Sequence, residues 1–146
     1  MDYSYIIIPI IVAIATQALK LITDSMRGNF TLSQMLLSYG GMPSSHAAFS
    51  ASITTLIGLR LGVEAPMFAL ALVFTLLIMR DAVSFRALLG NQAKLLNRVR
   101  ARLPESEQVE IPKFRERMGH SLLEVLLGAA TGLVLTYLLN LFSVGV

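Results

Sequence analysis

The chain has 146 residues, of which 55% are hydrophobic and only 14% charged, whereas soluble domains carry about 25% charged residues. This length gives one compact unit, residues 1–146, and the shortage of charge indicates lipid as the solvent. The absence of cysteine excludes disulfides and thiolate sites, and the basic residues, nine of twelve between Arg80 and Arg117, indicate a membrane surface or an anionic ligand and not nucleic acid.

Four segments are apolar over about the 20 residues that a bilayer crossing requires. The first runs roughly from Tyr3 to Ile22, and the second follows Pro43-Ser44-Ser45 and continues to about Leu61. The third runs roughly from Ala65 to Arg80 and the fourth from Ser121 to Phe142. No positive charge precedes the first segment, so we expect a retained span and not a cleaved signal peptide. The sequence therefore predicts an all-α, polytopic membrane helical bundle with four transmembrane helices.

The connecting segments differ in character. Residues Asn29 to Gly41 are uncharged and too short to cross, which predicts a short interfacial or re-entrant helix. Residues Ala87 to Arg102 form a basic amphipathic stretch, which we expect to be a cytoplasmic helix on anionic lipid. Residues Pro104 to Pro112 contain three glutamates and predict a solvent loop.

The Lys and Arg residues of the loops predict the orientation. Lys20 and Arg27 follow the first span, and the basic cluster follows the third. Both loops lie on one side of the membrane, so we expect them in the cytoplasm and both termini outside. We expect an integral protein of a bacterial inner (plasma) membrane.

Several polar residues fall at one end of this bundle, because alternating spans bring four segment ends to the same side. Ionisable groups at membrane depth are costly and indicate a functional site. The residues are Lys20 and Arg27 after the first span, His46 at the start of the second, Arg80 and Asp81 at the end of the third, and His120 and Glu124 at the start of the fourth.

Spacing by fours places residues on one helix face. One such stripe is His120, Glu124, Gly128, Gly132 and Thr136, and the other is His46, Ser50, Thr54 and Gly58. We expect the two stripes to pack together and to bring the histidines close, with the glycines serving only to allow close approach.

Ser44 and Ser45 precede His46 at the start of the second span. A serine N-cap and the backbone N–H groups of a helix N-terminus form a ready anion site. Lysine and arginine side chains would complete a phosphate site there.

These motifs resemble the divergent PAP2 family, which is related to acid phosphatases and vanadium-dependent haloperoxidases. The resemblance extends from Gln17 and Lys20 to Gly132. It is carried by Gly40-Gly41-Met42-Pro43-Ser44-Ser45-His46-Ala47, Arg80-Asp81, Gly90-Asn91-Gln92-Ala93 and Gly119-His120 followed by Glu124-Val125 and Gly128.

The resemblance implies a metal-independent phosphatase without a cofactor, acting on a lipid phosphate or diphosphate such as a polyprenyl or glycerolipid phosphate. His120 would attack phosphorus to form a phosphohistidine, His46 would protonate the leaving oxygen, and Glu124 would orient His120. The phosphate would be bound by Lys20 and Arg27, which have the K-x6-R spacing of the family, and by Ser44 and Ser45.

The chain departs from the phosphatase motifs at four positions: Gly28 replaces proline, Ser45 replaces glycine, Glu124 replaces aspartate, and Phe114 stands where the motif S-R-x5-H has arginine. Arg80, Arg115 and Arg117 are candidates for the missing charge, and the spacing does not choose between them. The departures leave a second function open, a non-catalytic lipid-phosphate binding or transport protein. A vanadium haloperoxidase is a third and weaker alternative.

Purely structural interpretations also remain open. Lys20 and Arg27 would serve equally as anchors that extend to the membrane surface. Ser121-x-x-Glu124 fits a capping box, and Arg80-Asp81 fits a local ion pair. The expected partners are membrane lipids and a lipid phosphate substrate; a homodimer is compatible with the sequence, which locates no interface.

Overall fold

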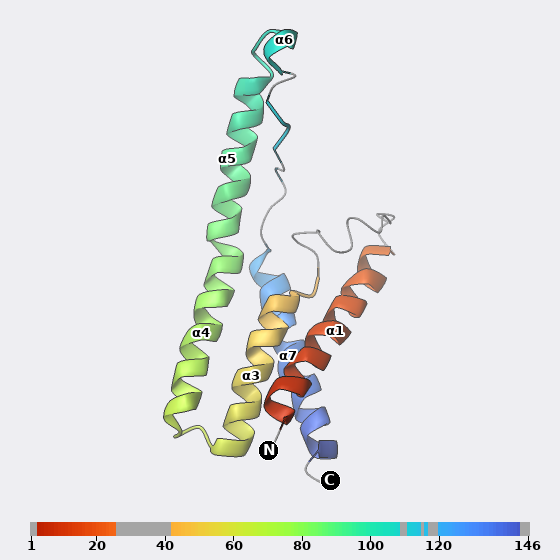
Figure 1. Cartoon of the computed structure of the whole chain (residues 1–146), viewed down its shortest axis with the longest axis vertical. Helices are drawn as coiled ribbons and strands as arrows, with labels where there is room; N and C mark the ends of the chain where they lie inside the picture. Colours follow the sequence, from red (N-terminus) through yellow and green to blue (C-terminus); the bar gives the residue numbers. More distant parts are fainter. Residues whose placement is uncertain (1–2, 26–41, 109–110, 115, 117–119, 144–146) are drawn as a thin grey trace.

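A computed structural model of the chain describes residues 3–25, 42–108, 111–114, 116 and 120–143. Within these ranges the secondary structure is α-helical (Figure 1). The helices are α1 (Ser4–Ser25), α3 (Ser45–Leu61), α4 (Pro66–Val83), α5 (Phe85–Arg100), α6 (Glu105–Gln108) and α7 (Leu122–Ser143). The segment predicted as an interfacial helix, Asn29 to Gly41, and the candidate Arg27 lie outside the described residues.

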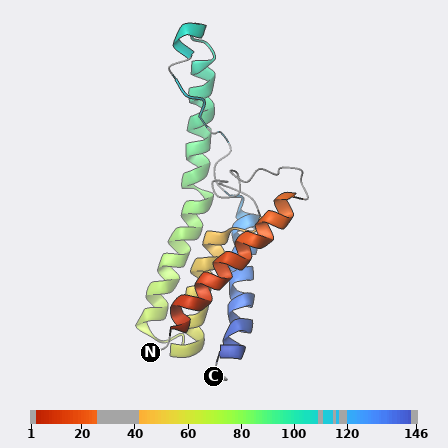
Figure 2. The same cartoon turned by 45° about the vertical axis from the view of Figure 1, so that its right-hand side comes forward.

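Helix α3 lies at the centre of the bundle. It packs against α1, α4 and α7, and α1 also packs against α7. Figures 1 and 2 show α3 between the long α4 and the pair formed by α1 and α7. Because successive helices alternate in direction, the beginnings of α3 and α7 lie at the same end of the bundle as the end of α1.

Among the described residues, three helical stretches are long and apolar enough to cross a membrane: Ser4–Thr23, Pro66–Arg100 and Leu122–Phe142. Their outward faces carry large apolar side chains, for example Ile14, Phe74 and Leu133, each more than half exposed. The interior is instead rich in hydroxyl groups, with Thr16, Ser52, Thr75 and Thr136 among the buried residues. A protein with an apolar surface and hydrogen-bonded polar groups inside has lipid as its solvent.

The four-span prediction is not confirmed, because α3 is not among these three stretches. Helix α3 has 17 residues, the lower limit of about 17–25 for a span. Serine and threonine also reduce its hydropathy, and they are tolerated because α1, α4 and α7 cover much of its surface. Pro9 lies inside α1, which continues through it.

The glycines of α7 allow α3 and α7 to come into backbone contact, as predicted. A Cβ atom at Gly128 would overlap the carbonyl oxygen of Ser44, and one at Gly132 would overlap that of Ala48. One turn further along, the hydroxyl of Thr136 donates to that of Ser52 at 2.6 Å. The predicted α7 stripe is therefore confirmed as the packing face toward α3.

The predicted α3 stripe was wrong in its partner. Ser50, Thr54 and Gly58 face α4, not α7: Thr54 Oγ1 and Thr75 Oγ1 are 2.9 Å apart, and Thr75 donates to the Ser50 carbonyl oxygen at 3.0 Å. A Cβ at Gly58 would meet the ring of Phe68 on α4. Spacing by fours identifies residues that share a face, but a central helix has several small-residue faces and the spacing does not identify their neighbours.

Helices α4 and α5 form one long rod that extends beyond the bundle (Figures 1 and 2). The backbone remains helical at Ser84, whose N–H donates to the Arg80 carbonyl oxygen at 2.8 Å and whose carbonyl oxygen accepts from Leu88 at 3.1 Å. The expected basic helix is therefore present, but it continues the axis of α4. A separate helix lying along the membrane surface is not confirmed.

The segment predicted as a solvent loop, Pro104 to Pro112, contains the short exposed helix α6. After α6 the chain returns beside α5. Arg100 holds this return by donating to the carbonyl oxygens of Ile111 and Gln108, both at 2.7 Å.

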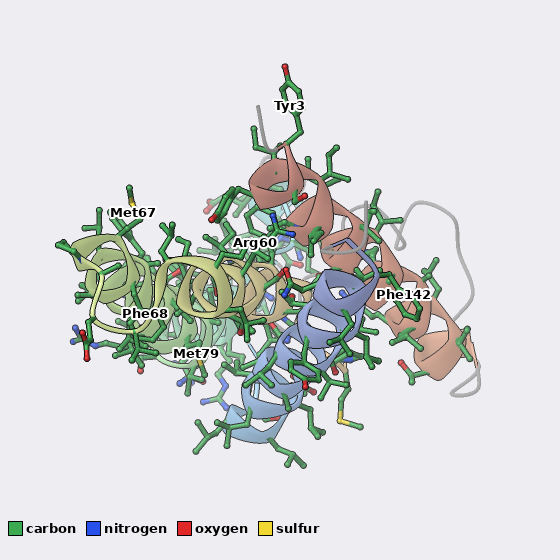
Figure 3. The ribbon with its side chains drawn as sticks, turned by 90° about the horizontal axis from the view of Figure 1, so that it is seen from below. Tyr3, Arg60, Met67, Phe68, Met79 and Phe142 are labelled. Carbon is green, nitrogen blue, oxygen red and sulfur yellow. The ribbon has the colours of Figure 1, made fainter. Side chains whose placement is uncertain are left out.

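At the opposite end of the bundle, Arg60 joins three helices (Figure 3). Its Nε donates to Asn140 Oδ1 at 2.8 Å, and its guanidinium lies 5.5 Å from the ring centre of Tyr5, a cation–π distance.

Candidate functional site

The candidate site lies at the end of the bundle where α3 and α7 begin, α1 ends and α4 passes into α5 (Figure 1). Backbone hydrogen bonds join α3, α4 and α7 there, and on α1 the hydroxyl of Thr23 donates to the Met42 carbonyl oxygen at 2.6 Å. The N–H of His120 donates to the Ala82 carbonyl oxygen at 3.1 Å, and the N–H of Ser44 donates to the Glu124 carbonyl oxygen at 3.1 Å. The structure therefore brings four segment ends together, as the alternation of spans predicts.

His120 and Glu124 form a close pair. His120 Nδ1 lies 3.2 Å from Glu124 Oε2, and their side chains are only 6% and 19% exposed. A carboxylate at this distance accepts the Nδ1–H proton, which leaves the lone pair on Nε2. The pair thus presents an imidazole nitrogen suited to nucleophilic attack or proton transfer.

Glu124 also forms the capping box that the sequence left open. Its Oε2 accepts the N–H of Ser121 at 3.0 Å, and its own N–H donates to the Ser121 hydroxyl at 3.3 Å. The same carboxylate therefore begins α7 and binds the imidazole. Because Glu124 is fixed by the helix end, the orientation of His120 is fixed with it.

Burial is the main cause that lowers the pKa of His120 below its usual value. The hydrogen bond and the negative charge of Glu124 act in the opposite direction, while the positive charges of Lys20 and Arg86 lower this pKa further. The net result favours the neutral imidazole, which is the nucleophilic form.

His46 is the second residue of α3 and is exposed. The pKa of its imidazole is lowered, first by partial burial and then by the positive charges of Arg86, protonated His120 and Lys20. The two histidines of the chain, which lie 74 positions apart in the sequence, therefore share one electrostatic environment. His46 is the more accessible of the two.

Lys20 is buried near the end of α1, with only 4% of its surface exposed. A lysine is almost never buried to this extent without polar or charged partners. Its charge acts on both histidines. This position does not fit an anchor that extends to the membrane surface, and it places a cation beside the imidazoles.

Ser44 and Ser45 have other partners in this structure. Ser44 is fully buried and caps α3, accepting the N–H of Ala47 at 3.4 Å. Ser45 Oγ donates to Gln17 Oε1 at 3.0 Å and so joins α3 to α1. Phosphate binding by either serine stays a prediction, and Ser44 has no exposed surface for it in this conformation.

The sequence analysis missed Arg86, whose charge acts on both histidines. Arg80 is exposed and is not among the charges that act on them. Asp81 pairs with Arg86, at 3.8 Å from Oδ2 to Nε, and not with Arg80 as the local-pair interpretation supposes. Arg115 and Arg117 lie outside the described residues. Arg86 lies four residues after Ala82, and only the helix that continues through Ser84 brings it to the site.

Among the residues that the structure describes, no group of three or more His, Cys, Asp or Glu side chains is placed to hold a metal ion. The site is instead composed of two imidazoles, one carboxylate and nearby cations. Such a set can bind an anion and can transfer protons through its imidazoles.

Comparison with known proteins identifies the family to which the chain belongs. The model of the divergent PAP2 family matches residues 1–135. The chain is 32% identical to the uncharacterized membrane protein YuiD of Bacillus subtilis (strain 168), over 74% of this chain and 75% of that protein. No solved structure was found to match. With its three apolar helices and a membrane protein as relative, the chain is an integral membrane protein, and it belongs to the divergent PAP2 family.

Proposed function

We propose that the chain is a metal-independent membrane phosphatase that hydrolyses a lipid phosphate or diphosphate through a phosphohistidine. The observation that supports this proposal is the pair of His120 and Glu124, in which the lowered pKa of His120 favours its neutral form. The charge of Lys20, which is buried, acts on both His120 and the accessible His46. A carboxylate-oriented imidazole is an activated nucleophile, and a second imidazole is a suitable general acid.

In the first step, His120 Nε2 attacks phosphorus while the bond from phosphorus to the lipid oxygen breaks. His46, in its protonated form, gives its proton to that leaving oxygen, and the lipid alcohol or lower phosphate departs. Glu124 stabilises the charge that develops on His120 through its 3.2 Å contact with Nδ1. Lys20 stabilises the negative charge of the transferring group.

In the second step, a water molecule attacks the phosphohistidine. His46 is now neutral and accepts the proton of that water, so both histidines return to their starting states as inorganic phosphate leaves. Ser44 caps α3 and so holds its first turn, which contains His46, in place. Ser45 and Arg27 remain proposed phosphate ligands.

The substrate class follows from the position of the site at one end of an apolar bundle. A site at the level of lipid headgroups meets lipid phosphates first. We propose that α3 is a short fourth span, that both termini face outward, and that the site faces the cytoplasm of a bacterial inner membrane. The basic residues of α5 support this orientation, since loops rich in lysine and arginine face the cytoplasm.

The test is phosphate release by the purified protein in detergent from a panel that contains a polyprenyl diphosphate, a polyprenyl phosphate and a phosphatidate. We expect release from at least one of them, inhibition by vanadate, and loss of release in His120→Ala. Glu64→Gln is a matched control, since Glu64 is exposed between α3 and α4 at the other end of the bundle.

Trapping the intermediate tests the mechanism. Substrate labelled at the transferred phosphate should leave label on the protein that is stable to base and labile to acid, as a phosphohistidine is. His46→Ala should accumulate this label from a substrate with a good leaving group, because the second step lacks its base. Release from no substrate, or equal release by His120→Ala, would contradict the phosphatase; binding without release would favour a lipid-phosphate binding or transport protein.

A further inference from the structure

In the phosphatase motif S-R-x5-H, an arginine stands at the position that Phe114 occupies in this chain. Phe114 lies beside the distal part of α5: its carbonyl oxygen accepts from Asn97 Nδ2 at 2.8 Å, and its N–H donates to Asn97 Oδ1 at 3.0 Å. Asn97 lies eleven residues beyond Arg86 on α5, which corresponds to about 16 Å along a helix. The motif position is therefore too far along α5 for its side chain to serve the site.

Arg86 lies on the side of the rod that faces the histidines. Because the backbone is helical through Ser84, Ala82 and Arg86 are four residues apart on one face. Ala82 is buried against Ala47 and Val125, and its carbonyl oxygen accepts the N–H of His120 at 3.1 Å. Arg86 thus follows, one turn later, the residue that directly contacts His120.

We propose that Arg86 binds the phosphate oxygens of the substrate in place of the missing motif arginine, and that Asp81 positions its guanidinium. The substrate class in this inference rests on the proposed function. Asp81 Oδ2 lies 3.8 Å from Arg86 Nε, so the carboxylate approaches the Nε edge of the guanidinium. The two Nη atoms at the other edge match a pair of phosphate oxygens.

The burial of the pair supports this division of roles. The Arg86 side chain is 24% exposed and that of Asp81 is 51% exposed. An ion pair as exposed as this one contributes little to stability, so its orienting effect on Arg86 is its more important consequence. The positive charge of Arg86 also lowers the pKa of both imidazoles.

Kinetics of phosphate release test Arg86 directly. Arg86→Gln should lower kcat/KM by about 10²-fold, because a cation that binds the transferring phosphoryl group is lost. Arg86→Lys should recover only part of this loss, since lysine lacks the paired donors. Arg80→Gln is the matched control: it removes a positive charge from the exposed face of the same rod and should leave kcat/KM within about 3-fold of wild type.

The positioning role of Asp81 has its own signature. Asp81→Ala should raise KM by several-fold with a smaller change in kcat, as expected when a binding group becomes less ordered. In the Arg86→Gln background the same change should have no further effect, because residues that act through one another are not additive. An equal effect of Asp81→Ala in both backgrounds would overturn the positioning role.

Calorimetric binding of vanadate separates this inference from the phosphatase proposal. If wild type releases phosphate and Arg86→Gln behaves as Arg80→Gln does, the role of Arg86 is wrong and the phosphatase stands. If wild type releases nothing but binds vanadate, and only Arg86→Gln loses about 10-fold or more in affinity, the phosphatase is wrong and the phosphate-binding role of Arg86 stands. Absence of both release and Arg86-dependent binding would overturn both.

Discussion

The N–H of Ser44 donates to the carbonyl oxygen of Glu124 at 3.1 Å. This single bond joins the cap of α3 to the first turn of α7. His46 lies two residues beyond Ser44, and Glu124 also holds the ring of His120. The two imidazoles are therefore placed by neighbouring backbone segments.

Replacing Glu124 by glutamine should separate its electrostatic role from its capping role. Glutamine can still accept the N–H of Ser121, but it lacks the charge that raises the pKa of His120. We expect kcat to fall by about 10²-fold and the acidic limb of the kcat/KM profile to move to lower pH. An unmoved acidic limb would contradict the pairing with His120.

Ser121→Ala is the counterpart of that variant. It removes the hydroxyl that accepts the Glu124 N–H at 3.3 Å but keeps the carboxylate. We expect a loss of about 1 kcal/mol of stability, as for other N-caps, with an unchanged position of the acidic limb. Thermal unfolding in detergent and the pH profile check the two parts independently.

Stability should fall as the pH is lowered through the mildly acidic range. The pKa of His120 is lowered in the folded protein from its usual value of 6.5, mainly by burial. Below that value the unfolded chain binds the proton first, so protonation favours unfolding, and the loss continues until the pH passes the lowered folded pKa. His120→Asn should flatten this part of the curve; an equally steep curve in the variant would assign the loss to other groups.

Gly132→Ala should destabilise the bundle, because the added Cβ overlaps the Ala48 carbonyl oxygen and forces α3 and α7 apart. Overpacking of this kind costs about 1–3 kcal/mol. Ala130→Val adds bulk to an exposed position of the same helix and is the control. Unfolding midpoints that do not differ between the two variants would show that the helices separate at little cost.

Thr136→Val should remove the 2.6 Å hydrogen bond to the buried Ser52 hydroxyl while keeping the shape of the side chain. Hydrogen bonds between membrane helices contribute about 0.6 kcal/mol on average and up to about 1.7. Thr131→Val is the control, since the Thr131 hydroxyl donates within its own helix, to Leu127 at 2.7 Å. A double-mutant cycle with Ser52→Ala should give a coupling energy of this size.

Much of the architecture could be predicted from the sequence because lipid imposes simple requirements. Long apolar runs gave the ends of α1, α4 and α7 to within a few residues, and the glycine spacing gave the face of α7 that packs on α3. The membrane span count was less certain, since α3 is short and rich in hydroxyls. A helix that is covered on three sides does not need the composition of a lipid-facing span.

The positions of the histidines, Glu124 and Lys20 at one end followed from alternation of the spans. The position of Arg86 did not follow, because the third span was predicted to end at Arg80 and a separate helix was predicted to begin at Ala87. Only the continuity of the helix through Ser84 places Arg86 opposite His120. The face of α3 toward α4 was missed for a similar reason: Thr75 is a single hydroxyl in an apolar run, and its two partners lie 21 and 25 residues away.

The direct contact of Gly128 with the Ser44 carbonyl has a further consequence for how this site could change during evolution. Because no side chain separates α3 from α7 there, the spacing between the helix starts that hold His46 and His120 is set by the backbone. In the proposed phosphatase, exchange of the surrounding side chains would alter which lipid fits and how tightly it is held, while the separation of the two histidines would stay constant. Specificity can therefore drift in this scaffold without retuning its chemistry.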